Sequence, residues 1–198
     1  MAATEGRSLT RKTLLTVIVV GLVGVVAGAG TFSAFSGTTA NSGNSFAAGT
    51  VSLSDNDAGS AMYSLSNAKP TDSAQSCLTV TYGGSLSANV HLYGSSTGSL
   101  GSYLTLVIQP GHGTVSFGST CTNFVADGSA IYNGTLANFS NTYSNFANGL
   151  ALKNTNQASL TWTNGNAVVY QFQISLNNDN NAQGLSSTAT FTWEAQNT

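Results

Sequence analysis

Charged residues are scarce in this chain of 198 residues, in which five Lys or Arg and seven Asp or Glu make up only 6% of the total. An ordinary globular domain has about 25%. No basic patch is present, so nucleic acid is not an expected partner. Disorder is not indicated either, because 41% of the residues are hydrophobic and the net charge is small. A folded domain with a surface of hydroxyl and amide groups is expected.

Residues suited to catalysis or metal binding are also few. Glutamate occurs only as Glu5 and Glu194, and the two histidines are His91 and His112. A zinc protease of the common type needs His-Glu-x-x-His on a helix, which this chain lacks. We therefore expect no enzymatic activity, no cofactor and no metal site. His91 stands at a polar position of an alternating strand pattern and is expected to be exposed. His112 lies in a sequence typical of a turn.

One acidic cluster, Asp55-Asn56-Asp57, resembles the beginning of a calcium loop. It lacks the later glycine and the bidentate glutamate that such a loop needs. A solvated turn after a short strand is the prediction for this cluster.

Only two cysteines are present, Cys77 and Cys121. In an exported protein an even pair indicates a disulfide. The bond would close a loop of about 45 residues and contribute about 4 kcal/mol in the chain-entropy treatment.

The N-terminus supports export. Arg7, Arg11 and Lys12 precede an apolar run over residues 14–29, which ends among small residues. This pattern is typical of a secretory signal peptide, and the run is short for a membrane span of about 20 residues. We expect a secreted, extracellular or cell-surface protein that meets the membrane only as an uncleaved precursor. The small-residue rule favours cleavage after Ala29.

The rest of the chain alternates between apolar and polar residues, which indicates strands buried on one face. The alternating stretches are 51–53, 78–82, 90–92, 104–109, 160–162, 168–175 and 189–194. Between them lie Gly- and Asn-rich turn sequences over 83–84, 94–101, 110–113, 164–166 and 177–181. Many short strands with such turns predict an all-β, jelly-roll-like sandwich of two sheets behind the signal-peptide helix.

Two local predictions accompany this fold. Asn164-Gly165 between two strand patterns predicts a hairpin. Phe139, Tyr143, Phe146 and Leu150 are spaced by four, three and four residues, which predicts a short helix or turn within 127–157 that crosses one end of the sandwich.

Four stretches resemble the TasA and camelysin family. Residues 28–36 match the pattern Gly-Thr-aromatic-x-Ala-Phe, and residues 44–53 resemble Phe-x-x-Gly-Thr-Leu-x-Leu, with Val51 in place of the first Leu. Residues 64–70 resemble the family's next turn, although Thr71-Asp72 stands where Gly-Asp is usual. The closing strand at 190–196 is similar to the family's last strand, whereas the middle of the chain, about 95–160, matches poorly.

The resemblance implies cleavage by a signal peptidase between Ala34 and Phe35, and we prefer this position to Ala29. It implies a signal peptide at 1–34, a mobile N-terminal segment at 35–45 and a β-sandwich at 46–198. It also implies a matrix or surface-fibre subunit that polymerises with itself, head to tail, by donor-strand exchange. The candidate donor strand is Phe35, Ser36, Gly37, Thr38, Thr39, Ala40 and Asn41.

Two alternatives to this structural role remain. One is a monomeric surface or binding module of the same fold. The other is a camelysin-like metalloprotease, which the family's classification implies but the motifs of this chain do not support. The cysteine pair departs from the cysteine-free matrix members and indicates a separate branch.

Overall fold

A computed structural model of the chain describes residues 36–38, 49–63 and 67–198. The chain divides between Ala34 and Phe35, and only the second unit contains described residues. The predicted signal peptide, the cleavage between Ala34 and Phe35, and the donor-strand candidates Phe35, Thr39, Ala40 and Asn41 therefore lie outside the described residues. None of the helices in the described ranges has the length and apolar character that a bilayer crossing requires.

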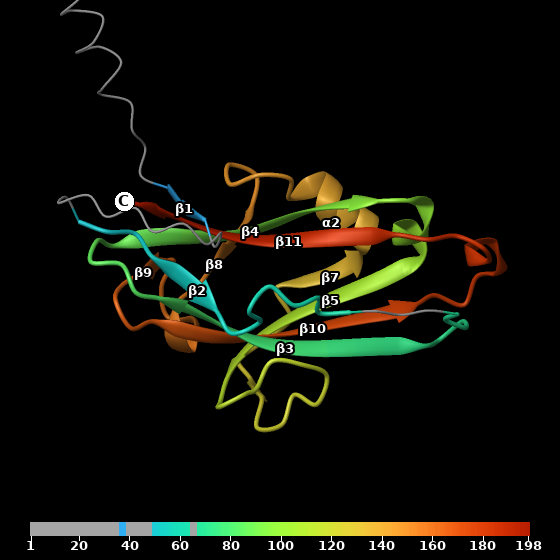
Figure 1. The fold of residues 1–198 in the computed structure, drawn as a ribbon, viewed down its shortest axis with the longest axis horizontal. Helices are drawn as coiled ribbons and strands as arrows, with labels where there is room; N and C mark the ends of the chain where they lie inside the picture. Colours follow the sequence, from blue (N-terminus) through green and yellow to red (C-terminus); the bar gives the residue numbers. More distant parts are fainter. Residues whose placement is uncertain (1–35, 39–48, 64–66) are drawn as a thin grey trace, which may run out of the picture. The chain divides into compact units, whose positions relative to one another are not determined.

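Two antiparallel sheets form the domain (Figure 1). The first, here called sheet A, has the order β1-β11-β4-β8, and β9 also pairs with β4. Its strands are β1 (Ser36–Thr38), β4 (Ala88–Thr97), β8 (Leu150–Leu152), β9 (Thr161–Trp162) and β11 (Thr188–Asn197). Both sheets contain strands that are distant in sequence, so the topology is non-local.

The second sheet, sheet B, has the order β2-β3-β10-β5-β6, and β7 also pairs with β5. Its strands are β2 (Leu53–Asp55), β3 (Ser73–Tyr82), β5 (Leu104–His112), β6 (Val125–Ala126), β7 (Tyr132–Thr135) and β10 (Ala167–Leu176). The predicted all-β, jelly-roll-like two-sheet sandwich is confirmed.

The buried core lies between the sheets and follows the alternation of the sequence. Along β10, Val168, Tyr170, Phe172 and Ile174 are buried, whereas Gln173 is exposed. Large apolar side chains on one face of a strand are removed from water when a second sheet covers that face, which is the main stabilising term. The alternation therefore decides which face of each sheet becomes the core.

In the described ranges one short α-helix lies within the predicted range 127–157, but of the four spaced residues only Phe139 is on it, and Leu150 begins strand β8. The helix is α2 (Leu136–Thr142), and its first turn is capped because Thr135 Oγ1 accepts a hydrogen bond from Asn138 N at 3.1 Å. Phe139 on this helix is fully buried. Its ring lies 5.0 Å from that of Tyr132. Three short 3₁₀ helices complete the elements: η1 (Ser99–Tyr103), η2 (Thr155–Gln157) and η3 (Asn180–Ala182).

The predicted hairpin at Asn164-Gly165 is wrong. The strands on its two sides belong to different sheets, since β9 pairs with β4 and β10 pairs with β3 and β5. Trp162 explains the difference, because its buried ring anchors β9 in sheet A and its Nε1 donates to Leu152 O at 2.9 Å. The turn itself is present, with Gly165 at φ 84°.

Two predicted turns are partly strand instead. β4 continues through Gly94 to Thr97, and β5 continues through Pro110 to His112. At Gly94 the reason is a close approach, because a Cβ there would lie 2.5 Å from Thr190 O and 3.3 Å from the ring of Phe139. Glycine in a strand therefore marks tight packing here rather than a turn.

The predicted disulfide Cys77–Cys121 is present, with the two Cα atoms 5.2 Å apart. It ties β3 to the segment 113–124. Val115 and Val169 are buried with Cys77 in a small cluster separate from the main core, against which Cys121 and Phe124 also pack. The bond thus fastens a loop over sheet B.

Candidate functional site

The edge of sheet A at β11 holds part of the N-terminal segment. β1 pairs antiparallel with β11 in the register Ser36↔Gln196, Gly37↔Ala195 and Thr38↔Glu194. Three of the seven donor-strand candidates therefore form a strand within their own chain. The segment has no apolar alternation of its own, so the open edge of β11 accounts for the pairing through main-chain bonds.

The remainder of this edge is open. In the described ranges, no strand pairs with the stretch 188–193 of β11 on the side away from β4. Thr188, Ala189 and Thr190 are exposed. An unpaired row of main-chain donors and acceptors is a template for a further strand.

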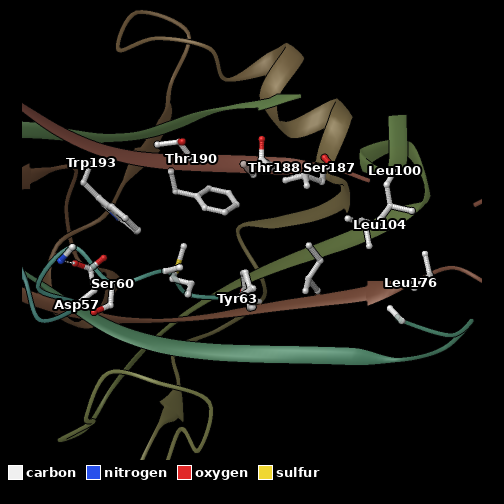
Figure 2. Close-up of a pocket in the computed structure, with 18 residues that line it drawn as sticks. Asp57, Ser60, Tyr63, Leu100, Leu104, Leu176, Ser187, Thr188, Thr190 and Trp193 are labelled. Atoms are coloured by element: carbon white, nitrogen blue, oxygen red, sulfur yellow. Dashed lines mark hydrogen bonds between the residues drawn. The ribbon is translucent and has the colours of Figure 1, made fainter. Parts of the chain in front are cut away.

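A cavity of about 690 Å³ lies beneath this open stretch, between the two sheets (Figure 2). Trp193 extends into it from β11, and Leu104 and Leu176 line it from sheet B. The segment 57–63, which follows β2, also contributes. The other large apolar residues of the lining are Met62, Tyr63, Leu100, Leu136, Ile174 and Phe191. Its volume is within the usual range for ligand pockets, so it has room for several large side chains.

Two hydrogen-bond donors in this lining lack partners. Trp193 Nε1 and Tyr63 Oη are buried and make no hydrogen bond in the described part of the chain. Burial raises the pKa of the Tyr63 phenol, which keeps it a protonated donor. A buried donor without a partner costs about 1–3 kcal/mol. The cavity is therefore suited to an occupant that brings both apolar side chains and carbonyl groups.

A polar cluster lies on the other face of β11. Glu194 is 9% exposed and accepts hydrogen bonds from Tyr93 Oη at 2.8 Å and from Gln196 Nε2 at 2.9 Å. It is opposite His91 on β4 and opposite Thr38 on β1 in the strand register. Burial, with the hydrogen bond to Glu194 and its charge, raises the pKa of Tyr93 to about 12.

The raised pKa of Tyr93 predicts that the stability difference between the unmodified protein and Tyr93→Phe changes at high pH. Because the pKa of Tyr93 is about 12 in the folded chain and ordinarily 10, its contribution is complete below pH 10 and is lost between pH 10 and 12. Below pH 10, Tyr93→Phe should have a constant, lower free energy of unfolding than the unmodified protein. The difference should shrink from pH 10 to 12 in urea titrations. Tyr103→Phe is the control, and a difference that does not change with pH contradicts the assignment.

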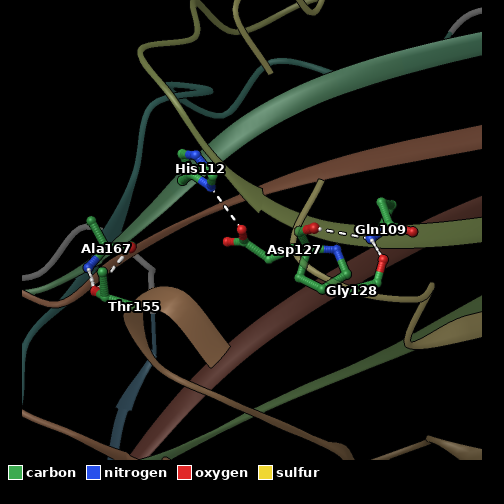
Figure 3. Close-up of polar contacts among 7 residues, drawn as sticks. Gln109, His112, Asp127, Gly128, Thr155 and Ala167 are labelled. Carbon is green, nitrogen blue, oxygen red and sulfur yellow. Dashed lines mark hydrogen bonds and ion pairs between the residues drawn. The ribbon is translucent and has the colours of Figure 1, made fainter. Parts of the chain in front are cut away.

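The two histidines lie on different sheets. His91 was predicted to be exposed, but it is half-buried because its ring stacks on Phe146 at 4.2 Å, and its Nδ1 is 2.7 Å from Phe146 O. His112 was placed in a turn, but it is the last residue of β5, and its Nδ1 is 2.7 Å from Asp127 Oδ1 (Figure 3). No group of three His, Cys, Asp or Glu that could hold a metal ion occurs in the described ranges.

The acidic cluster after β2 forms a turn with internal hydrogen bonds. Asn56 Oδ1 accepts from Thr79 N at 2.8 Å, and Asp57 Oδ1 accepts from Gly59 N at 2.7 Å. Burial and the neighbouring Asp57 raise the pKa of Asp55. These oxygens already serve the fold, so the turn interpretation describes this cluster better than a calcium loop.

In comparisons with known proteins, one family model matches this chain. Residues 8–98 match a family model described as camelysin metallo-endopeptidase. No curated protein matches the chain. The matched range includes β1 to β4 and three of the stretches that carry the resemblance, 28–36, 44–53 and 64–70, whereas the closing stretch 190–196 lies outside it.

Proposed function

We propose that this chain, which belongs to the TasA/camelysin family, is a secreted structural protein that polymerises by exchange of its N-terminal strand. The observation that carries the proposal is the edge of β11. It holds the strand β1 over residues 194–196 and leaves 188–193 open above an apolar cavity, in the described part of the chain. A strand that pairs here within one chain can pair with the same edge of another chain.

The assembly follows from general properties of strand addition. Main-chain hydrogen bonds supply affinity, and pockets for alternate side chains supply specificity. A contact between different surfaces of two copies repeats without closing and produces a fibre. In the precursor the signal sequence keeps the segment at the membrane, and cleavage by signal peptidase releases it. The partners are thus signal peptidase during export and further copies of the chain in an extracellular or biofilm matrix.

The test is electron microscopy of the processed protein beside the uncleaved precursor in detergent. Filaments are expected from the first and not from the second. N-terminal sequencing of the secreted form should begin at Phe35, and a start at Gly30 contradicts the cleavage site. A processed protein that stays monomeric at every concentration and salt condition contradicts the filament proposal and favours a monomeric surface module.

A protease is the function that the family description names, but the residues of this chain do not fit a catalytic metal. His91 and His112 lie on strands of different sheets, and each Nδ1 already has an oxygen partner. Three protein ligands are usual for catalytic zinc. We therefore expect no dependence of any activity on these two histidines.

This expectation has a direct measurement. The purified protein should contain less than stoichiometric zinc, and chelation should leave its melting temperature unchanged. Peptide hydrolysis that is present in the unmodified protein, and absent in a folded His91→Ala, His112→Ala variant, contradicts the proposal. Hydrolysis retained by the double variant shows that it does not depend on these two histidines.

A further inference from the structure

The cavity beneath β11 reaches the surface of the domain. The exposed residues of its lining belong to two stretches, 59–61 after β2 and 188–190 of β11. A small molecule that enters between these stretches meets a space of about 690 Å³, which is within the usual range of about 300–1,000 Å³ for ligand pockets. The cavity is therefore accessible to a drug-sized ligand and large enough to hold one.

One end of the cavity is apolar. Leu104 and Leu176 are opposite residues of β5 and β10, and Leu100 lies on η1. Figure 2 shows these three side chains at the end away from Trp193. Leucine side chains offer no hydrogen bond, whereas a buried water usually makes about three. An apolar group that displaces such poorly held water gains affinity, so this end favours an alkyl or aryl group.

Two hydrogen-bond donors of the lining lack partners. Trp193 is 3% exposed, and neither its Nε1 nor Tyr63 Oη makes a hydrogen bond within the described part of the chain. Trp162 is different, because its Nε1 donates to Leu152 O at 2.9 Å. Since most buried donors in proteins have a partner, the two donors of the lining indicate a ligand with an acceptor oxygen.

The charges of the lining favour an uncharged ligand. Among the described residues that form it, Asp57 is the only one with a charged side chain, and no Lys, Arg or His is present. A ligand with a carboxylate would lose its hydration without a cation to pair with, and Asp57 would repel it. A cationic group would offer no acceptor to the two donors. The carbonyl oxygen of a ketone or an ester accepts their hydrogen bonds without either disadvantage.

We propose that the cavity beneath β11 binds a neutral, mainly apolar small molecule that carries a carbonyl oxygen, such as a ketone or ester of an alkyl or aryl chain. The apolar part contacts Leu100, Leu104 and Leu176. The carbonyl oxygen accepts hydrogen bonds from Trp193 Nε1 and Tyr63 Oη. This site does not depend on polymerisation, because one copy of the chain supplies every residue that forms it.

The first test uses the processed protein and the dye Nile red, which is neutral, mainly apolar and carries a ring carbonyl. Its fluorescence rises when it leaves water, so a titration gives the dissociation constant and the stoichiometry. Ala189→Trp fills the cavity, because Ala189 lies in its lining. Ser95→Trp is the matched control, since Ser95 is exposed on the neighbouring strand β4 and does not line the cavity. We expect one saturable site, weakened tenfold or more in Ala189→Trp and unchanged in Ser95→Trp.

Two conservative variants test the hydrogen bonds. Tyr63→Phe removes only a hydroxyl group, and Trp193→Phe removes the indole N–H but keeps an aromatic ring. Displacement of Nile red by hexanophenone and by hexylbenzene, which differ by one carbonyl group, gives a ratio of dissociation constants from which changes in packing largely cancel. Each variant should weaken hexanophenone relative to hexylbenzene by about fivefold, as expected for one hydrogen bond. Tyr103→Phe, outside the lining, should leave the ratio unchanged.

The charge of the ligand is tested with phenylhexanoate, which has as many carbon atoms as hexanophenone but ends in a carboxylate. At neutral pH it should displace Nile red at least tenfold more weakly than hexanophenone. Melting temperatures report the folding of each variant, and Tyr63→Phe should not melt lower, because the hydroxyl that it removes has no partner in the described part of the chain. Sedimentation velocity records the assembly state in each titration.

Four results would overturn the proposal. The folded protein binds no Nile red saturably, or Ala189→Trp binds it as tightly as the unmodified protein does. The ratio for hexanophenone and hexylbenzene is the same in the unmodified protein, Tyr63→Phe and Trp193→Phe, or phenylhexanoate binds as tightly as hexanophenone. A processed protein that binds these ligands as expected but forms no filaments contradicts the proposed function and leaves the ligand site standing.

Discussion

Deletion of residues 35–44 is expected to abolish filament formation and to leave a folded monomer. The removed stretch includes β1 and therefore the only strand that the structure places on the β11 edge among the described residues. It supplies three residue pairs to sheet A, whereas β4 pairs with all ten residues of β11 from Thr188 to Asn197 on the other side. Loss of a few exposed main-chain bonds should lower stability by about 1–2 kcal/mol.

The melting temperature of the truncated protein should thus fall by only a few degrees, at about 2–4 °C per kcal/mol for a domain of this size. Electron microscopy and sedimentation velocity give the assembly state. A variant with the order of residues 39–44 scrambled is the control. It keeps the length of the connection and should still polymerise. Filaments of unchanged form from the truncated protein would refute the role of the segment.

Alternation predicted the long strands well because each one is buried on one face. β3, β5, β10 and β11 contain the predicted stretches 78–82, 104–109, 168–175 and 189–194. The prediction of a turn at Gly94 was wrong. Glycine is required there by close packing against Thr190 and Phe139 within a strand. That requirement comes from residues far away in the sequence.

Strand order was not predictable by the same means. Asn164-Gly165 is typical of a hairpin, yet the burial of Trp162 decides that the preceding strand joins sheet A. Local turn chemistry describes only the turn, whereas pairing depends on which surfaces are buried together. The position of β11 beside the edge of its sheet is a consequence of this order and has no local signal.

The sequence therefore predicted one part of the candidate site, the N-terminal segment, and not the cavity beside β11. The family resemblance drew attention to Phe35 and the segment after it, and the structure places 36–38 on β11. The cavity was missed, because Ala189 and Leu100 come together only through the fold. Glu194 was noticed as one of two glutamates, but its partner Tyr93 is 101 residues away.

The disulfide is expected to have the largest effect on stability. Cys77 and Cys121 are 44 residues apart in sequence, and closing such a loop stabilises the fold by about 4 kcal/mol in the chain-entropy treatment. The double variant Cys77→Ala, Cys121→Ala should melt about 8–16 °C lower, given about 2–4 °C per kcal/mol. Differential scanning calorimetry gives this shift directly.

Besides its effect on the stability of the whole domain, the disulfide stabilises one local region. The disulfide holds the segment 113–124 over sheet B, where Val115 and Val169 are buried with Cys77. Without the bond this small cluster should open first, and a protease should cleave 113–124 before the rest of the domain unfolds. Reduction of the unmodified protein should reproduce the lower melting temperature, whereas the double variant should not respond to reductant. A double variant that melts within 2 °C of the oxidised protein, about the effect of 1 kcal/mol, would show that packing of the loop, not the covalent bond, holds it in place.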